Sequence, residues 1–170
     1  LNDYQERITY DANGNIIKYM RNSTAAPNIN MDNLTYNYYP NTNRLKYVQD
    51  NVADANYADD IDNQTNTSNY SYDAIGNLVS DAKENITLVK WNVYGKITEI
   101  QKAFTAANPV TNIKYTYDAA GNRISKRVQK NGTTTIEFTW YVRDASGNVM
   151  ATYNSTGTVT PVTSAYTLNL

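Results

Sequence analysis

The side chains that could carry chemistry in this chain are acidic, amide and phenolic. The sequence contains no histidine and no cysteine. This composition excludes Ser-His-Asp and Cys-His catalysis, imidazole and thiolate metal ligands, and disulfide bonds within the chain. Two kinds of site remain possible: a cation site formed by carboxylate and amide oxygens, or general acid/base catalysis by a pair of carboxylates.

The stretch DANGN, residues 11–15, resembles the start of a calcium loop. Asp11, Asn13 and Asn15 alternate as oxygen ligands do in such loops. An EF-hand, however, needs glycine at its sixth position and an acid at its twelfth, whereas here Gly14 is fourth and Asn22 is twelfth. The pattern therefore favours a turn over a calcium site.

The densest acidic run is ADDID, which contains Asp59, Asp60 and Asp62. It lies in the longest segment between repeats, where a solvated loop is the favoured interpretation and a bound cation the alternative. No carboxylate pair has the context of a glycosidase or an aspartic protease. We therefore expect no catalytic residue, no cofactor and no metal, and predict that the chain is not an enzyme.

Composition limits the partners of the chain. The net charge is -1 and basic residues are not clustered, so nucleic acid is an unlikely partner. No run of about 18 apolar residues is present, so we expect no membrane insertion. A content of 41% hydrophobic and 12% aromatic residues is typical of a globular unit. The first residues read as though cut from a longer protein, and TSAYTLNL at the other end reads as the start of another strand.

One short pattern recurs six times along the chain. Three copies are complete, in TYDANGNII, SYDAIGNLV and TYDAAGNRI, and three are degenerate. The repeats cover residues 8–22, 36–50, 70–85, 89–102, 115–129 and 138–153. Such a short internal period indicates that each copy is one fixed local structure.

Each repeat is predicted to be a β-hairpin. In IKYTYDAAGNRISKRV, residues 113–128, two alternating stretches flank a turn that Asp118 starts and Gly121 completes at positive φ. Thr42 takes the glycine position in the second repeat. The motif residues, for which we predict a structural role, are Tyr10, Asp11, Gly14, Tyr38, Tyr72, Asp73, Gly76, Trp91, Gly95, Tyr117, Asp118, Gly121, Asp144 and Gly147.

The predicted fold class is all-β, with consecutive antiparallel hairpins that contribute about a dozen strands to one sheet. After the Asp118 turn we expect Arg123, Ser125 and Arg127 to share one face. The stretch IEFTWYV, residues 136–142, alternates most regularly, with Ile136, Phe138, Trp140 and Val142 on one face. Loops are expected at residues 22–33, 50–69 and 105–112. Because one hairpin cannot bury its own apolar face, residues 1–170 are predicted to form one segment of a larger protein.

The kernels TYDANGNII, SYDAIGNLV and TYDAAGNRISK resemble the YD repeat of the Rhs and YD-repeat family, which also occurs in bacterial toxin-complex shell proteins and in teneurins. The segment YVRDASGNVMATY is similar to the region just ahead of the repeat-associated core in Rhs proteins. This resemblance implies a spiral β-sheet that forms a hollow shell around a C-terminal toxin. It supplies no protease residue for this chain.

The resemblance implies a structural function, as a wall segment that encloses a C-terminal toxin or effector and helps to deliver it. The expected partners are the rest of the shell, the enclosed toxin domain and a bacterial secretion machine. The alternative is a cell-surface adhesin or carbohydrate-binding segment, for which surface glycans would be the partner. In both cases the chain would be secreted or on the bacterial cell surface.

Overall fold

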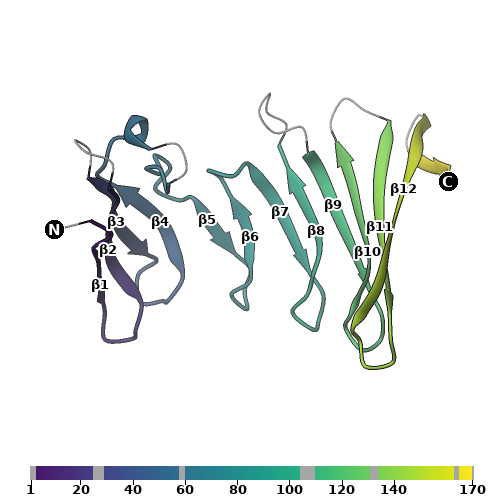
Figure 1. Ribbon diagram of the computed structural model, residues 1–170, viewed down its shortest axis with the longest axis horizontal. Helices are drawn as coiled ribbons and strands as arrows, with labels where there is room; N and C mark the ends of the chain where they lie inside the picture. The colour runs from purple at the N-terminus through teal and green to yellow at the C-terminus, as the bar shows by residue number, and fades with distance from the viewer. Residues whose placement is uncertain are drawn as a thin grey trace. The chain divides into compact units, whose positions relative to one another are not determined.

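The computed structural model describes residues 3–24, 29–57, 60–103, 110–130, 134–162 and 165–169 (Figure 1). The predicted all-β class is confirmed, because consecutive antiparallel hairpins make up these residues. Their one helical element is a single 3-10 turn at Asp54–Asn56. Within the described part of the chain, no helix has the length and apolarity needed to cross a membrane. Residues 1–83 and 84–170 form two compact units, and each is described by itself.

The first unit contains six strands. They are β1 (Glu6–Tyr10), β2 (Ile16–Asn22), β3 (Asn30–Tyr38), β4 (Leu45–Asp50), β5 (Tyr70–Tyr72) and β6 (Leu78–Asp81). The first four make an antiparallel sheet in chain order, and β5 pairs with β6. Within this unit the hairpin turns lie along the same edge of the strands (Figure 1).

The second unit contains seven strands. They are β7 (Ile86–Trp91), β8 (Ile97–Lys102), β9 (Val110–Tyr117), β10 (Arg123–Lys130), β11 (Thr135–Arg143), β12 (Val149–Val162) and β13 (Ala165–Asn169). Each strand is hydrogen-bonded to the next in chain order. The turns that follow β7, β9 and β11 again lie along one edge (Figure 1).

A register shift occurs at the same place in the hairpin of each of the six repeats. The last residue before each turn pairs with the first residue after it, and the ladder slips by one residue beside that pair. The six pairs are Tyr10 with Ile16, Tyr38 with Leu45, Tyr72 with Leu78, Trp91 with Ile97, Tyr117 with Arg123, and Arg143 with Val149. A β-bulge is therefore part of the repeated unit, where it increases the local twist of the strands.

The bulge changes which side chains share a face. Arg123 opposes Tyr117, whereas Ser125 opposes Thr116, so one extra residue stands between them on β10. Arg123 therefore lies on the tyrosine face, and its guanidinium carbon is 4.1 Å from the centre of the Tyr115 ring. The prediction that Arg123 shares a face with Ser125 and Arg127 is wrong, because strict alternation fails across a bulge.

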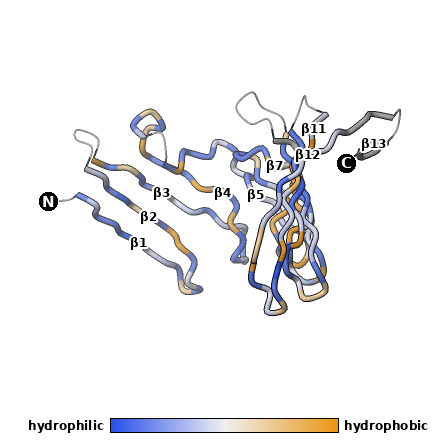
Figure 2. Tube along the Cα trace, turned by 45° about the vertical axis from the view of Figure 1, so that its right-hand side comes forward, coloured by the Kyte–Doolittle hydropathy of each residue, from blue (hydrophilic) through white to orange (hydrophobic). Residues whose placement is uncertain are grey.

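The apolar side chains change face between the strands of the second unit. Val89, Ile100, Ile113 and Val128 oppose one another in a row across β7 to β10. Ile136 and Phe138 on β11 instead oppose Gln129 and Arg127, on the other face. Both are buried, but Trp140 and Val142 further along β11 are 39% and 46% exposed. Figure 2 accordingly shows the hydrophobic positions as short stretches distributed among the strands.

The prediction of one continuous sheet is wrong in the first unit, because β4 and β5 are not ladder neighbours. Gln64, from the segment between them, is bonded to the edge of β4 instead. Its side-chain oxygen accepts from the Val48 N–H at 2.8 Å, and its own backbone N–H donates to the Val48 carbonyl at 3.2 Å. One residue thus satisfies both backbone groups that a neighbouring strand would pair.

Two of the predicted loops also need correction. Strand β3 begins at Asn30, so residues 30–33 extend the sheet and are not loop. Strand β9 begins at Val110, inside the segment expected to be loop at 105–112, and residues 105–109 lie outside the described part of the chain. In the third predicted loop, 50–69, Asp50 ends β4, and the described residues 51–57 and 60–69 contain no strand, as expected.

The substitution Gln64→Leu should destabilise the first unit. Val48 is 4% exposed, so its N–H would remain unpaired away from water, at a cost of about 1 to 3 kcal/mol. Urea unfolding followed by circular dichroism measures the loss. Gln49→Leu is the matched control, since Gln49 is exposed on the same strand and should change the free energy of unfolding by less than about 0.5 kcal/mol. Equal stability of the two variants would contradict the assigned role of Gln64.

Candidate functional site

The repeated feature of this chain is a turn that an acidic side chain closes. In the fifth repeat, the Asp118 N–H donates to the Asn122 carbonyl and the Gly121 N–H donates to the Asp118 carbonyl, both at 3.0 Å. The Asp118 carboxylate accepts the backbone N–H of Asn122 at 2.8 Å and its side-chain amide at 3.2 Å. Gly121 has φ +82°, a conformation that disfavours a Cβ.

Four copies share this arrangement. The acidic residues Asp11, Asp73, Asp118 and Asp144 are bonded in the same way to Asn15, Asn77, Asn122 and Asn148. In the fourth repeat Asn92 takes the acidic position, and its side-chain oxygen accepts the N–H groups of Tyr94 and Lys96 at 3.0 Å. The final asparagine of the kernel was missed from the sequence, although its recurrence after each of those four glycines was the available signal.

These hydrogen bonds explain the role of the carboxylates in the turns, which is to accept N–H groups of the turn itself. The backbone N–H of Asn122 is the largest influence on the pKa of Asp118, and together with the side-chain amide of the same residue it holds that pKa below its ordinary value against the opposing effect of desolvation. In DANGN both Asp11 oxygens accept hydrogen bonds from the turn itself. The alternation of Asp and Asn that resembles a calcium loop is thus used to close a chain reversal.

The second repeat departs from the predicted turn. Its loop is one residue longer, and Tyr39 occupies the acidic position, with the Thr42 N–H donating to the Tyr39 carbonyl at 3.2 Å. The positive φ, 59°, falls on Asn41 and not on Thr42. Asparagine is the residue after glycine that best tolerates this conformation, so the extra residue removes the need for glycine at position 42.

In the second, third and fifth repeats, the kernel tyrosine bonds the repeat to the preceding one. Its hydroxyl donates to the backbone carbonyl of the first residue after the previous turn. The bonds run from Tyr38 to Ile16 at 2.8 Å, from Tyr72 to Leu45 at 2.9 Å, and from Tyr117 to Ile97 at 2.6 Å. Each acceptor is a residue that pairs across a register shift, where the ladder is irregular.

The sixth repeat makes the same bond with a different side chain. Arg143 stands in the tyrosine position, and its Nε donates to the Arg123 carbonyl at 3.0 Å. Arg123 is the first residue after the fifth turn. A second guanidinium nitrogen of Arg143 donates to the Gly147 carbonyl at 2.7 Å. The position therefore requires a long side chain that ends in a donor, and an aromatic ring is one way to supply it. Trp91 occupies this position on β7, and Tyr10 occupies it in the first repeat, where its side chain is 56% exposed.

The turns of successive repeats also touch one another. The Asn15 amide donates to the Asn43 side-chain oxygen at 2.9 Å, and Arg44 donates to the Ala74 carbonyl at 3.2 Å. In the second unit, a Cβ built on Gly147 would lie 3.1 Å from the Asn122 side-chain oxygen. Glycine at position 147 is thus favoured by the neighbouring turn as well as by its own φ of +88°.

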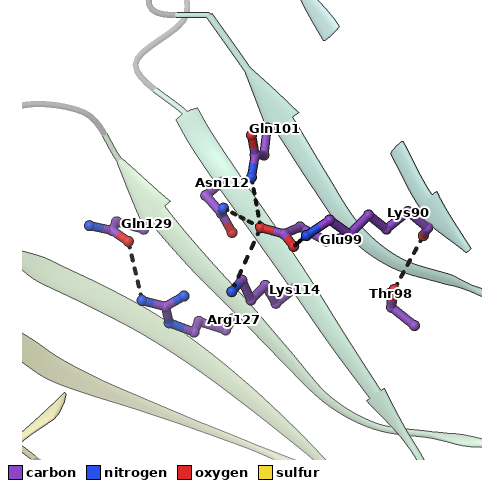
Figure 3. Close-up of polar contacts among 8 residues, drawn as sticks. All are labelled: Lys90, Thr98, Glu99, Gln101, Asn112, Lys114, Arg127 and Gln129. Carbon is purple, nitrogen blue, oxygen red and sulfur yellow. Dashed lines mark hydrogen bonds and ion pairs between the residues drawn. The ribbon is translucent and has the colours of Figure 1, made fainter. Parts of the chain in front are cut away.

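One face of the second unit carries a polar network centred on Glu99 of β8, which is 8% exposed (Figure 3). Its Oε1 accepts from Gln101 at 3.0 Å and from Asn112 at 2.9 Å. The Lys90 ammonium lies 3.0 Å from Oε2, and that of Lys114 lies 3.6 Å from Oε1. Strands β7 to β9 all contribute to it, so the network joins three strands on one face.

The network keeps Glu99 ionised. Burial alone would raise its pKa, but hydrogen bonds from Gln101, Asn112 and Lys90, together with the charge of Lys114, lower the pKa from 4.5 to about 2. The contacts of this carboxylate with Gln101, Asn112, Lys90 and Lys114 are all to hydrogen-bond donors or cations. This arrangement suits an anchored structural anion and leaves Glu99 no proton to give at neutral pH.

The acidic run of the first unit divides between two environments. Asp62 pairs with Lys83 at 3.2 Å on the surface. Asp60 instead lies beside Asp32 of β3 and Asp50 of β4, two buried residues that no sequence pattern connects with it. Asp59 lies outside the described residues.

Tyr117→Phe should lower stability by about 1 kcal/mol, because it removes the 2.6 Å hydrogen bond to the Ile97 carbonyl and preserves the ring. Chemical unfolding measures the change. Tyr94→Phe is the control, since that side chain is 80% exposed and should leave stability unaltered. A tyrosine that acted only through its ring would make the two variants indistinguishable.

Glu99 should stabilise the fold above about pH 4.5, and this contribution should disappear as the pH falls toward about 2. The sign follows from a folded pKa that is below the unfolded one, which makes ionised Glu99 the stabilising form. The difference between the two pKa values corresponds to roughly 3 kcal/mol. Glu99→Gln should therefore flatten the acid limb of a plot of stability against pH. Glu137→Gln, which breaks an exposed pair with Lys130, should preserve that limb, and an unchanged limb in Glu99→Gln would refute the assignment.

No protein-family model and no curated protein matches this chain. Among solved structures, one match is titled as the crystal structure of TcdB2-TccC3-Cdc42. The two chains are 14% identical, and the match covers 96% of this chain and 9% of the other, with a TM-score of 0.37. This chain therefore spans about 9% of the length of the chain that it matches, and the likeness is too low to assign a family.

Proposed function

We propose that this chain is a wall segment of a larger β-sheet shell that encloses a C-terminal toxin or effector domain. The observation that carries the proposal is the bond from one repeat to the preceding one. Because the donors of the second, third, fifth and sixth repeats each use an acceptor of the repeat before, these bonds run head to tail along the chain. Such a unit is suited to extension by further copies.

Exposed apolar side chains support the proposal that another protein surface covers part of the second unit. In the second unit Met150 is 72% exposed, Tyr153 is 62% exposed and Trp140 is 39% exposed. Tyr153 opposes Trp140 across β11 and β12, so the two aromatic side chains adjoin on one face. Contiguous apolar surface of this kind usually marks a contact with another protein surface. The rest of the shell or the enclosed domain would cover it.

The chemistry of the turns supports a structural role over a catalytic one. The carboxylates of Asp11, Asp118 and Asp144 hold backbone and amide N–H groups, and Glu99 is held by two lysines and two amides. A general acid or base needs a pKa near the working pH, whereas these groups have pKa values lowered away from it.

Dimensions show why further repeats are needed. Strands lie about 4.8 Å apart, so the seven strands of the second unit span roughly 30 Å. A wall around a domain about 35 Å across needs a circumference above roughly 100 Å, or more than about 20 strands per turn. The segment would therefore act as a section of wall within the full-length protein, which a bacterial secretion machine would deliver to the cell surface or the medium.

The test uses the full-length protein. The domain that follows the repeats should kill cells when expressed alone, and should resist protease inside the intact protein. Gly121→Val places a β-branched residue at φ +82°, at a cost of at least about 1 to 2 kcal/mol, and should expose that domain to protease. Ala120→Val, in the exposed part of the same turn, is the matched control and should leave the domain protected.

The competing function is an adhesin or carbohydrate-binding segment, which Trp140 and Tyr153 favour because exposed rings stack on sugars. Binding to immobilised glycans that Trp140→Ala abolishes, in a full-length protein without a toxic C-terminal domain, would overturn the shell proposal in favour of that function.

A further inference from the structure

Three carboxylates of the first unit converge where its sheet is interrupted. Asp32 is on β3, Asp50 ends β4, and Asp60 belongs to the segment that follows. One oxygen of each lies within 4.8 Å of an oxygen of both others. Asp32 and Asp50 are 2% and 6% exposed, and Asp60 is half-buried. Three acidic side chains from separate segments therefore share one partly desolvated space.

The protein groups around this cluster satisfy only part of it. Arg21 donates through Nε to Oδ2 of Asp32 at 2.5 Å. The backbone N–H groups of Asn33 and Val52 donate to Oδ1 of Asp50 at 2.9 and 3.1 Å. Among the described residues, the Oδ1 atoms of Asp32 and Asp60 are buried and have no hydrogen-bond partner. The Asp32 side chain has no exposed surface, so water does not reach that oxygen.

The charges at this cluster do not balance. Three carboxylates face one guanidinium, and a buried charge without a partner is costly. Burial, and after it the charges of Asp32, Asp62 and Asp50, raise the pKa of Asp60. A proton bridges only two oxygens and so relieves one pair, whereas a divalent cation can contact all three carboxylates at once.

We propose that Asp32, Asp50 and Asp60 bind a Ca²⁺ ion that ties the segment after β4 to β3 and β4. The ligand set is carboxylate oxygen alone, which suits a hard cation and disfavours zinc or copper. Ca²⁺ is preferred to Mg²⁺ because it accepts irregular geometry from separate segments. Asn63, three residues after Asp60, also has a buried side-chain oxygen without a partner among the described residues, and is the next candidate ligand along this segment.

The site is independent of the proposed shell function, because it lies within one unit and needs no neighbouring repeat. Its consequence is local. Bound Ca²⁺ would hold the segment that carries Gln64 against the edge of β4, where a strand neighbour is absent. The ion would thus strengthen the edge of β4, where the Gln64 side chain replaces a backbone ladder.

The test compares thermal unfolding of the chain in EDTA and in millimolar CaCl₂. Calcium should raise the midpoint of the wild-type protein by about 3 to 6 °C. Tb³⁺, a luminescent substitute for Ca²⁺, should emit on tyrosine excitation, because Tyr36 lies close enough to Asp32 for that carboxylate to raise the pKa of its hydroxyl, after the larger effect of burial. No midpoint shift and no Tb³⁺ emission would overturn the proposal, and an equal shift with MgCl₂ would overturn the choice of Ca²⁺.

Asp60→Asn is the decisive variant, because it removes one charge and leaves the buried Asp32–Arg21 pair intact. It should be more stable than wild type in EDTA, since one repulsive charge is gone, and should lose the calcium shift. Asp62→Asn is the matched control, because Asp62 lies in the same segment but is paired with Lys83 on the surface, and it should keep the shift. A calcium shift that survives in Asp60→Asn would refute the site.

Discussion

The structure depends on one constraint, the need to reverse the chain within five or six residues without leaving backbone groups unpaired. An acidic or asparagine side chain meets this need by accepting N–H groups that the turn itself cannot bond. The reversal is so tight that the strands slip by one residue beside it. The bulge in turn places the kernel tyrosine beside the carbonyl of the preceding repeat. The turn, the β-bulge and the hydrogen bond between repeats thus depend on one another.

This combination of turn, β-bulge and inter-repeat hydrogen bond explains how hairpins with few buried side chains stay together. Few side chains of the described residues are fully buried, and two of the largest of these, Asn69 and Asp32, are polar. In a sheet with one half-buried apolar row, hydrophobic burial contributes less than it does in a two-layer domain. Networks such as that of Glu99 add bonds between strands on the other face. The desolvation cost of Glu99 is offset because two cations and two amides hold its charge.

The sequence predicted the local parts of this structure and missed the non-local ones. The positions of the six turns follow from short-range chemistry, and all six hairpins form. The predicted strand face was wrong at Arg123, because the alternation of side chains in the sequence does not reveal where a β-bulge interrupts it. Nor could the alternation of side chains predict that Ile136 opposes Gln129. The alternation within one strand does not define the register in which that strand pairs with its neighbour. The contact of Asp60 with Asp32 and Asp50 was equally hidden, since residues from three segments meet only in the folded chain.

The insertion between β4 and β5 shows how a repeat array tolerates irregularity. In an ideal array each strand pairs with the next through the backbone, so a long insertion would expose an edge. Here Gln64 imitates the missing strand at Val48, its amide donates to the Tyr70 hydroxyl at 2.9 Å, and Tyr39 and Tyr72 donate to backbone carbonyls across the gap. Side chains therefore replace the ladder exactly where the repeat pattern is broken. Because nearest-neighbour contacts supply most of the stability in repeat proteins, such a substitution lets the array continue past the insertion without a regular strand at that place.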